Sequence, residues 1–212
     1  MPAALRIALA ILVAALAALA GMWLARERPA ERLELEHATV FPSPRALPDF
    51  VLTDHTGAPF GPEQLKGGWH ILFFGFTHCP DVCPSTLATL SAARRQLADL
   101  PAGERPSVVL VSVDPGRDTV ARLAEYVAFF DPEFVGVTGD PAALEALTRQ
   151  LGVAVLVGEP DDSGNYPIDH TATLFLVDPQ GRMAAVFGTP HTPDGIAQDY
   201  RAILEHAAGR RG

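Results

Sequence analysis

Two short runs of nearly unbroken apolar residues stand out in the middle of the chain. They cover residues 71–76 and 108–113 and are rich in β-branched and aromatic side chains, which is typical of strands covered on both faces. Between them Leu87, Leu90 and Leu97 recur at helical spacing, and a similar pattern follows the second run. This order predicts a β-α-β unit with parallel strands and a right-handed crossover.

A second pair of apolar runs covers residues 173–177 and 183–187. The turn-forming sequence Asp178-Pro179-Gln180-Gly181 separates them, which predicts a β-hairpin. Thr192 is expected to cap a last helix, with Pro193 in its first position. The elements therefore follow the order β-α-β-α, an insertion, and β-β-α. This layout is thioredoxin-like, so the predicted fold class is α/β, with a central mixed sheet flanked by helices.

The start of the chain predicts a different kind of segment. Residues 7–24 are uncharged and almost wholly apolar, and about 18 residues nearly cross a hydrocarbon core of about 30 Å. Residues 1–25 are therefore predicted to be a transmembrane anchor or, because Ala18-Leu19-Ala20 fits a small-residue cleavage site, a signal peptide. The polar, proline-containing stretch 26–47 is predicted to be a linker, and residues 48–212 one domain.

The charge of the chain restricts the classes of partner that it is expected to bind. The formal net charge is −9 and the isoelectric point is about 5.1, and the basic residues form no clustered stripe. A nucleic-acid partner is therefore not expected.

Cys79 and Cys83 are the only cysteines, and they lie four residues apart. Pro84 is tolerated only in the first turn of a helix, so the helix that follows should begin near residues 81–83. Cys79 would then lie on the loop and Cys83 in the first turn, where free N–H groups and the helix dipole favour thiolates. A pair at this spacing can close a disulfide or bind one soft metal ion.

Three parts of the chain are predicted to meet at one edge of the sheet. The Cys79 loop and Asp114 each follow the C-terminal end of a parallel strand, where ligands gather in such sheets. If the third core strand runs antiparallel, as in thioredoxin-like folds, His170 at its N-terminal end shares that edge. This last placement rests on fold analogy.

Three motifs make a family resemblance specific. The runs at residues 75–84, 112–119 and 169–178 resemble the signature segments of the Sco/SenC family, in the same order and at similar spacing between about Pro48 and Glu205. The family consists of membrane-anchored, thioredoxin-like copper proteins that help to assemble the dinuclear copper centre of cytochrome c oxidase. The resemblance implies a bacterial inner-membrane protein whose domain lies on the periplasmic side.

The resemblance also implies roles for individual residues. Cys79, Cys83 and His170 would be the copper ligands, and the family's aspartate pair falls on Asp114 and Asp118. The chemistry agrees, because two thiolates select soft ions such as Cu(I), and an added imidazole also suits Cu(II). Zinc usually takes a fourth protein ligand.

Several residues carry a second interpretation. The cysteine pair could be an inert disulfide, although so short a loop stabilises little, and His78 is the next candidate ligand after His170. Asp114 and Asp118 could serve the site or a partner, or could begin the next helix, with Asp118 as its N-cap. Asp169 could orient the imidazole or end its loop.

Two functions remain in contention. In the first, the domain is a metallochaperone that delivers copper to the copper-bearing subunit of cytochrome c oxidase. In the second, it is a thiol-disulfide oxidoreductase that reduces the cysteines of that copper site, with Cys79 as the nucleophile and Cys83 as the resolving thiol. The pair is one residue longer than the usual redox Cys-x-x-Cys, which favours copper over enzymatic activity. A separate thiol reductant protein is expected as a partner.

Overall fold

The computed structural model describes residues 2–26, 33 and 35–209. The chain divides into two compact units, Met1–Glu34 and Leu35–Gly212. The first unit contains helix α1 (Ala3–Arg26), on which the predicted anchor falls. Within the described part of the chain, no helix combines the length and apolar character needed to cross a membrane.

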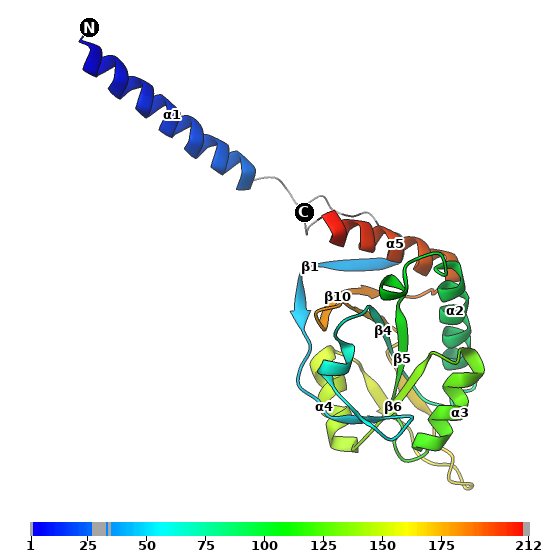
Figure 1. Cartoon of the computed structure of the whole chain (residues 1–212). Coiled ribbons are helices and arrows are strands. Elements are labelled where there is room, and N and C mark those ends of the chain that lie inside the picture. The colour runs from blue at the N-terminus through cyan, green and yellow to red at the C-terminus, as the bar shows by residue number, and fades with distance from the viewer. Residues whose placement is uncertain (1, 27–32, 34, 210–212) are drawn as a thin grey trace. The chain divides into compact units, whose positions relative to one another are not determined.

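The second unit is built on an eight-stranded mixed sheet with the strand order β1-β10-β9-β4-β5-β6-β2-β3 (Figure 1). A separate two-stranded sheet pairs β7 with β8. The strands are β1 (Ala38–Ala46), β2 (Leu52–Asp54), β3 (Pro59–Phe60), β4 (His70–Gly75), β5 (Ser107–Ser112), β6 (Val135–Thr138), β7 (Val155–Val157), β8 (Ile168–His170), β9 (Leu174–Val177) and β10 (Arg182–Phe187). The helices are α2 (Val82–Gln96), α3 (Val120–Phe130), α4 (Pro141–Leu151) and α5 (Pro193–Gly209), with short 3-10 turns at Pro62–Leu65 and Ala102–Glu104.

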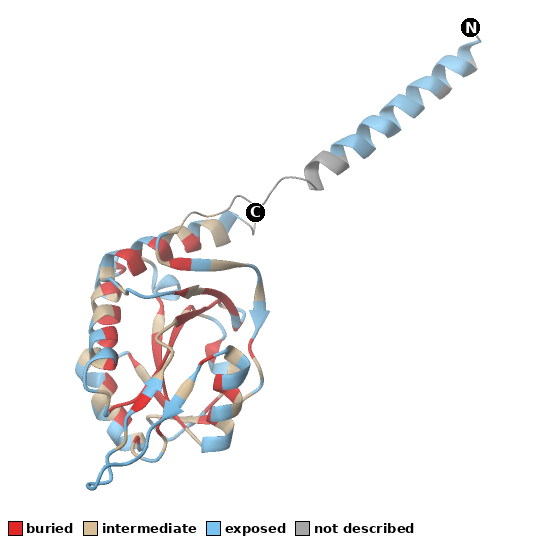
Figure 2. Cartoon of the chain, turned by 180° about the vertical axis from the view of Figure 1, so that it is seen from behind, coloured by how far each residue is buried: buried red, intermediate tan, exposed pale blue. Residues whose placement is uncertain are grey.

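The predicted β-α-β unit is confirmed, and a second β-α-β unit that shares β5 follows it. Strand β4 pairs in parallel with β5, and β5 with β6, with α2 and α3 as the crossovers. Both crossover helices lie on one side of the sheet, and α4 lies on the other (Figure 1). The buried residues concentrate on the strands and on the helix faces turned toward them (Figure 2), as expected of strands covered on both faces.

The predicted hairpin is also confirmed and sets the direction of the third core strand. Strands β9 and β10 are antiparallel neighbours, and β9 is antiparallel to β4, with Leu174 opposite Phe73. The N-terminal end of β9 therefore lies at the same sheet edge as the C-terminal end of β4. Helix α5 begins at Pro193, and the Thr192 hydroxyl accepts from the N–H of Gly195 as expected of a cap.

The predicted linker over residues 26–47 is wrong in its second half. Residues 38–46 form β1, which pairs with β10 at the edge of the sheet. Pro42 and Pro44 lie where the register shifts between Val40 and Arg45. Edge strands and bulges tolerate prolines, because a missing N–H there breaks no ladder. A proline-containing sequence is therefore compatible with this strand.

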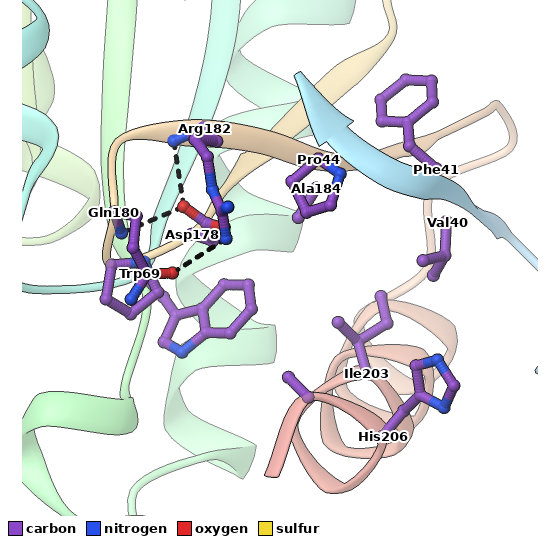
Figure 3. Close-up of a pocket in the computed structure, with 12 residues that line it drawn as sticks. Val40, Phe41, Pro44, Trp69, Asp178, Gln180, Arg182, Ala184, Ile203 and His206 are labelled. Atoms are coloured by element: carbon purple, nitrogen blue, oxygen red, sulfur yellow. Dashed lines mark hydrogen bonds and ion pairs between the residues drawn. The ribbon is translucent and has the colours of Figure 1, made fainter. Parts of the chain in front are cut away.

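A pocket of about 240 Å³ lies at the end of the sheet strands opposite the cysteines (Figure 3). Asp178 lies there, after the C-terminal end of β9, and is 4% exposed. Its carboxylate accepts from the N–H groups of Gln180 and Arg182 and from the Arg182 guanidinium at 2.7 Å. Because these partners satisfy the carboxylate, Asp178 stabilises the β9–β10 turn.

His70, at the start of β4, should make stability depend on pH. Burial lowers its pKa from 6.5 to about 4, and its Nδ1 is buried without a hydrogen-bond partner. The unfolded chain therefore takes up this proton more readily than the folded one. The stability that the neutral imidazole of His70 contributes is complete above pH 6.5 and is lost as the pH falls toward 4. Because the side chain is partly exposed, we expect the free energy of unfolding to fall by about 2 kcal/mol over this range.

Urea unfolding of the wild type and of His70→Gln at pH 7 and pH 4.5 measures this effect. We expect the fall in unfolding free energy between the two pH values to be smaller in the variant. An equal fall in both proteins would assign the pH dependence to other groups.

Candidate metal centre

The two cysteines lie at the junction between β4 and α2. Helix α2 begins at Val82, with Asp81 in the N-cap position, so the helix start predicted from Pro84 is confirmed. Cys79 lies on the preceding loop, and the backbone N–H of Cys83 donates to its Sγ at 3.4 Å. Both cysteines are free thiols.

The third member of the group is His170, the last residue of β8. Its Nε2 lies 3.3 Å from the Sγ of Cys83. The Nε2 and the Sγ atoms of Cys79 and Cys83 all lie within 4.8 Å of one another. The structure therefore brings together the three residues that the sequence predicted as ligands.

The imidazole of His170 is held in a defined orientation. Its Nδ1 lies 3.1 Å from the carbonyl oxygen of Thr171, and the rings of Phe73 and Phe76 pack against it edge to face, with centroids 6.0 and 5.9 Å away. Because a carbonyl only accepts, we assign the proton to Nδ1, which leaves the lone pair of Nε2 directed at the thiols. Asp169, predicted either to orient the imidazole or to end its loop, is exposed, and the hydrogen-bond partner of Nδ1 is the carbonyl of Thr171.

The local electrostatics favour the uncharged forms of Cys83 and His170. Burial raises the pKa of the fully buried Cys83 thiol, and the N–H of Phe76 opposes this only in part. Burial also lowers the pKa of His170. The expected stabilisation of a thiolate by the start of α2 is therefore outweighed at Cys83 by desolvation. A cation that binds here would offset this desolvation and stabilise the thiolate form of Cys83.

This donor set fits a soft metal ion. Two sulfurs and a neutral imidazole are the groups that Cu(I) prefers. The group faces a pocket of about 320 Å³ whose wall includes Pro80, Val82, Tyr166 and Pro167, and Cys79 is half-buried there. The site therefore opens to the surface on its Cys79 side.

Asp118 has a different role from the predicted helix cap. The N-cap of α3 is Thr119, whose hydroxyl accepts from the N–H of Arg122. Asp118 is 0% exposed, and its carboxylate accepts from the N–H of Thr77 at 3.0 Å, the hydroxyl of Thr77 at 2.6 Å and the hydroxyl of Ser112 at 2.6 Å. It thus fastens the loop before Cys79 to the end of β5.

Asp114 connects the same region to the segment that leads into β8. It forms an ion pair with Arg117 and accepts from the hydroxyl of Tyr166 at 2.7 Å. The guanidinium of Arg117 lies over the Tyr166 ring, 3.7 Å from its centroid. Arg117 lies inside the 112–119 motif, whereas no local sequence signal pointed to Tyr166.

His78, the alternative ligand, lies in a second group. Its Nδ1 is 3.7 Å from Asp118, and with Asp114 these residues form a cluster separate from the two thiols and His170. Both carboxylates of that cluster already have protein partners. His170 is therefore the histidine that the structure groups with the cysteines.

A family model described as SCO1/SenC matches residues 41–205, which is more than half of the chain. The chain belongs to the SCO1/SenC family. A relative from Stutzerimonas stutzeri is 38% identical to this SCO1/SenC protein over 176 residues, which cover 82% of this chain and 84% of the relative.

Solved structures of Sco proteins agree with this assignment. Copper-bound ScoI of Arabidopsis thaliana matches with a TM-score of 0.69 and 34% identity, covering 74% of this chain and 98% of that one. Copper-bound ScoI of Bradyrhizobium japonicum matches with a TM-score of 0.67 and 36% identity, covering 75% and 99%. The match to these structures confirms the predicted thioredoxin-like α/β fold.

Proposed function

We propose that this protein binds Cu(I) through the Sγ atoms of Cys79 and Cys83 and the Nε2 of His170. The observation that carries the proposal is the convergence of these three atoms within 4.8 Å of one another. Copper in the solved relatives supports the choice of metal. Cu(II) is the alternative oxidation state, because imidazole also suits it.

Binding Cu(I) at this site requires that both thiols lose their protons to solvent. The ion offsets the desolvation that otherwise keeps the Cys83 thiol protonated. The imidazole needs no proton change, because the lowered pKa of His170 already keeps it neutral. Copper loading should therefore release about two protons where both thiols start protonated.

We further propose that the protein passes copper to the copper-bearing subunit of cytochrome c oxidase during its assembly. Membership of the Sco family, whose members are cytochrome c oxidase assembly proteins, supports this role. So does the opening of the site on the Cys79 side, since an incoming thiolate could replace one ligand at a time. Three protein ligands leave room for such an exchange.

The unequal burial of the thiols favours thiol-disulfide exchange as a second candidate function. Cys79 is half-buried and Cys83 fully buried, and the N–H of Cys83 donates to the sulfur of Cys79. Cys79 would attack a disulfide of the oxidase subunit, which forms a mixed disulfide and releases the subunit's first thiol. Cys83 would then attack the sulfur of Cys79 in that mixed disulfide and release the subunit's second thiol. The subunit would gain two thiols while this pair became a disulfide.

A two-arm assay with the soluble copper domain of the oxidase subunit distinguishes the functions. In one arm, Cu(I)-loaded protein meets the reduced, copper-free subunit, and mass spectrometry of the intact subunit counts the copper ions that it gains. In the other, the reduced, copper-free protein meets the oxidised subunit, and mass spectrometry after alkylation counts its thiols. Metallation in the first arm supports the chaperone; thiol gain in the second arm without metallation in the first would make the protein a reductase.

His170→Ala should weaken Cu(I) binding without abolishing it. Two thiolates alone still suit a soft ion, so we expect the affinity to fall about 30-fold, equivalent to about 2 kcal/mol. A competition titration against a chromophoric Cu(I) chelator measures the change. His206→Ala, on α5 at the opposite sheet edge, is the control. An unchanged affinity in His170→Ala would remove the imidazole from the ligand set.

We also propose that the N-terminal segment directs the domain to the periplasmic side of the bacterial inner membrane. The support is the uncharged, apolar run over residues 7–24. Protease treatment of spheroplasts tests the location: the domain should be digested without lysis of the inner membrane. Protection until lysis would place it in the cytoplasm.

A further inference from the structure

Strand β7 has one unpaired edge in the part of the chain that the structure describes. It covers Val155–Val157, and its neighbour in the two-stranded sheet is β8. All three side chains are apolar, and Leu156 and Val157 are 69% and 62% exposed. Native edge strands usually carry a charge, a proline or a bulge that keeps other chains from pairing with them. Because β7 carries none of these, its free edge is open to an added strand.

The backbone of β7 directs hydrogen-bonding groups along this edge. The N–H of Gly158, the residue after β7, donates to the carbonyl of Pro167 at 2.9 Å. In an antiparallel pair, the backbone groups of successive residues point alternately toward the partner strand and away from it. Those of Leu156 therefore point toward β8, and the N–H and C=O groups of Val155 and Val157 point away from it. An extended segment laid along β7 would pair with these groups, as in β-strand addition.

A pocket of about 380 Å³ lies beside this edge, between the β7–β8 ribbon and α4. Val155 and Val157 line it from the ribbon, and Leu144 lines it from α4. Val157 belongs to the wall and is still mostly exposed, so the pocket opens at the edge of β7. Side chains alternate across a strand, so every second side chain of an added strand would point into the pocket. Tyr166 and Ile168 belong both to this wall and to the wall of the pocket at the metal centre, so the two pockets are neighbours.

The surface next to this edge is acidic. Four exposed carboxylates lie on the loop after β7 and on β8, and none of them forms an ion pair within the described residues: Glu159, Asp161, Asp162 and Asp169. Like charges would repel a second copy of this chain, whose formal net charge is −9. A segment that carries lysine or arginine would be attracted instead.

We propose that the free edge of β7 binds an extended, apolar and basic segment of the protein with which this chain exchanges copper. The segment would form a third strand of the β7–β8 ribbon, with an apolar side chain in the pocket and a basic one beside the acidic loop. Two strand spacings amount to about 10 Å, so the segment would run about that far from the backbone of His170 on β8. This inference deepens the proposed exchange of copper and rests on it for the identity of the partner.

Hydrogen exchange with a peptide probe tests the edge without copper. The full-length, copper-free protein in micelles of a non-ionic detergent is mixed with a short peptide in which valine and lysine alternate, and mass spectrometry reads the exchange. We expect slower exchange over residues 155–158, because the outward N–H groups gain acceptors, and less protection at high ionic strength. A peptide of alternating valine and glutamate should give none. Equal protection by both peptides, or by neither, would overturn the proposal, as would protection that needs only a higher protein concentration, since a second copy would then occupy the edge.

Val157→Pro removes one outward N–H, and Val157→Thr is its matched control. The N–H of Val157 does not bond to β8, so the proline should leave the ribbon paired, whereas the threonine keeps both the N–H and a branched side chain. We expect Val157→Pro to abolish the protection by the basic peptide and Val157→Thr to keep it. The double variant Glu159→Gln, Asp162→Asn leaves the backbone of β7 unchanged and should weaken the protection. Full protection in both Val157→Pro and the double variant would overturn the proposal.

Copper transfer separates a failure of this inference from a failure of the proposed function. Val157→Pro should slow transfer of Cu(I) to the reduced copper domain of the oxidase subunit roughly tenfold, with Cu(I) affinity in the competition titration unchanged. Transfer by Val157→Pro at the wild-type rate would overturn the assignment of the exchange partner to this edge. Absence of transfer by the wild type would overturn the proposed exchange instead, while the protection of residues 155–158 would still decide whether the edge binds a basic segment.

Discussion

Cys83→Ser should lower the Cu(I) affinity of this protein by roughly a hundredfold to a thousandfold. Structural metal sites gain about 10–16 kcal/mol from about four ligands, so one thiolate accounts for about 2.5–4 kcal/mol. A serine hydroxyl stays protonated and is a hard donor, which a soft ion does not prefer. The Sγ of Cys83 also lies 3.3 Å from the Nε2 of His170. Its loss would therefore remove one proposed ligand and the neighbour of another.

The same competition titration measures this loss, with Cys79→Ser and Cys83→Ala measured in parallel. The alanine variant separates the loss of a ligand from the effect of a hydroxyl in a fully buried position. Circular dichroism of each variant shows whether the fold is intact. A folded Cys83→Ser protein that bound Cu(I) within tenfold of the wild type would contradict the assignment of this sulfur as a ligand.

Asp118→Ala should destabilise the domain by about 3–5 kcal/mol, since three buried donors lose their acceptor, and this is a large fraction of the stability of a typical domain. The carboxylate is fully buried, and its loss would leave the N–H and hydroxyl of Thr77 and the hydroxyl of Ser112 without their acceptor. Unpaired buried donors retain their full desolvation cost. Urea unfolding of the metal-free protein measures the effect.

Asp140→Ala is the matched control for Asp118→Ala. Asp140 caps α4 by accepting from the N–H groups of Ala142 and Ala143 in an exposed position, so its loss should cost about 1 kcal/mol. If the two variants lost equal stability, the buried network would not be the source of the effect. Asp118→Asn should fall between them, because the amide keeps an acceptor but adds donors that the site does not need.

Local patterns in the sequence predicted the elements that depend on local physics. The two apolar runs predicted β4 and β5, because strands covered on both faces exclude polar residues. Pro84 located the start of α2 to within a residue, since a proline fits only the first turn of a helix. The meeting of Cys79, Cys83 and His170 required one further step, the antiparallel direction of β9 taken from fold analogy.

Features that depend on distant partners could not be read from local sequence. Residues 38–46 became a strand because β10 offers them an edge, although Pro42 and Pro44 argue locally for a linker. Asp118 lies at a typical capping position, but its carboxylate accepts a hydrogen bond from the hydroxyl of Thr77, 41 residues away. The hydroxyl of Tyr166 donates a hydrogen bond to Asp114, which lies 52 residues away in the sequence. In each case a tertiary contact outweighed or replaced a local preference.

The small β7–β8 sheet makes the three candidate ligands unequal in how firmly they are held. His170 lies on a ribbon of two three-residue strands outside the main sheet, whereas the cysteines follow a strand at the centre of that sheet. Short ribbons open far more often than sheet cores unfold. A copper ion would then leave in steps, losing the imidazole first and both sulfurs later. Its residence time would be set by the contacts of the ribbon, such as that between Tyr166 and Asp114, rather than by the stability of the whole domain.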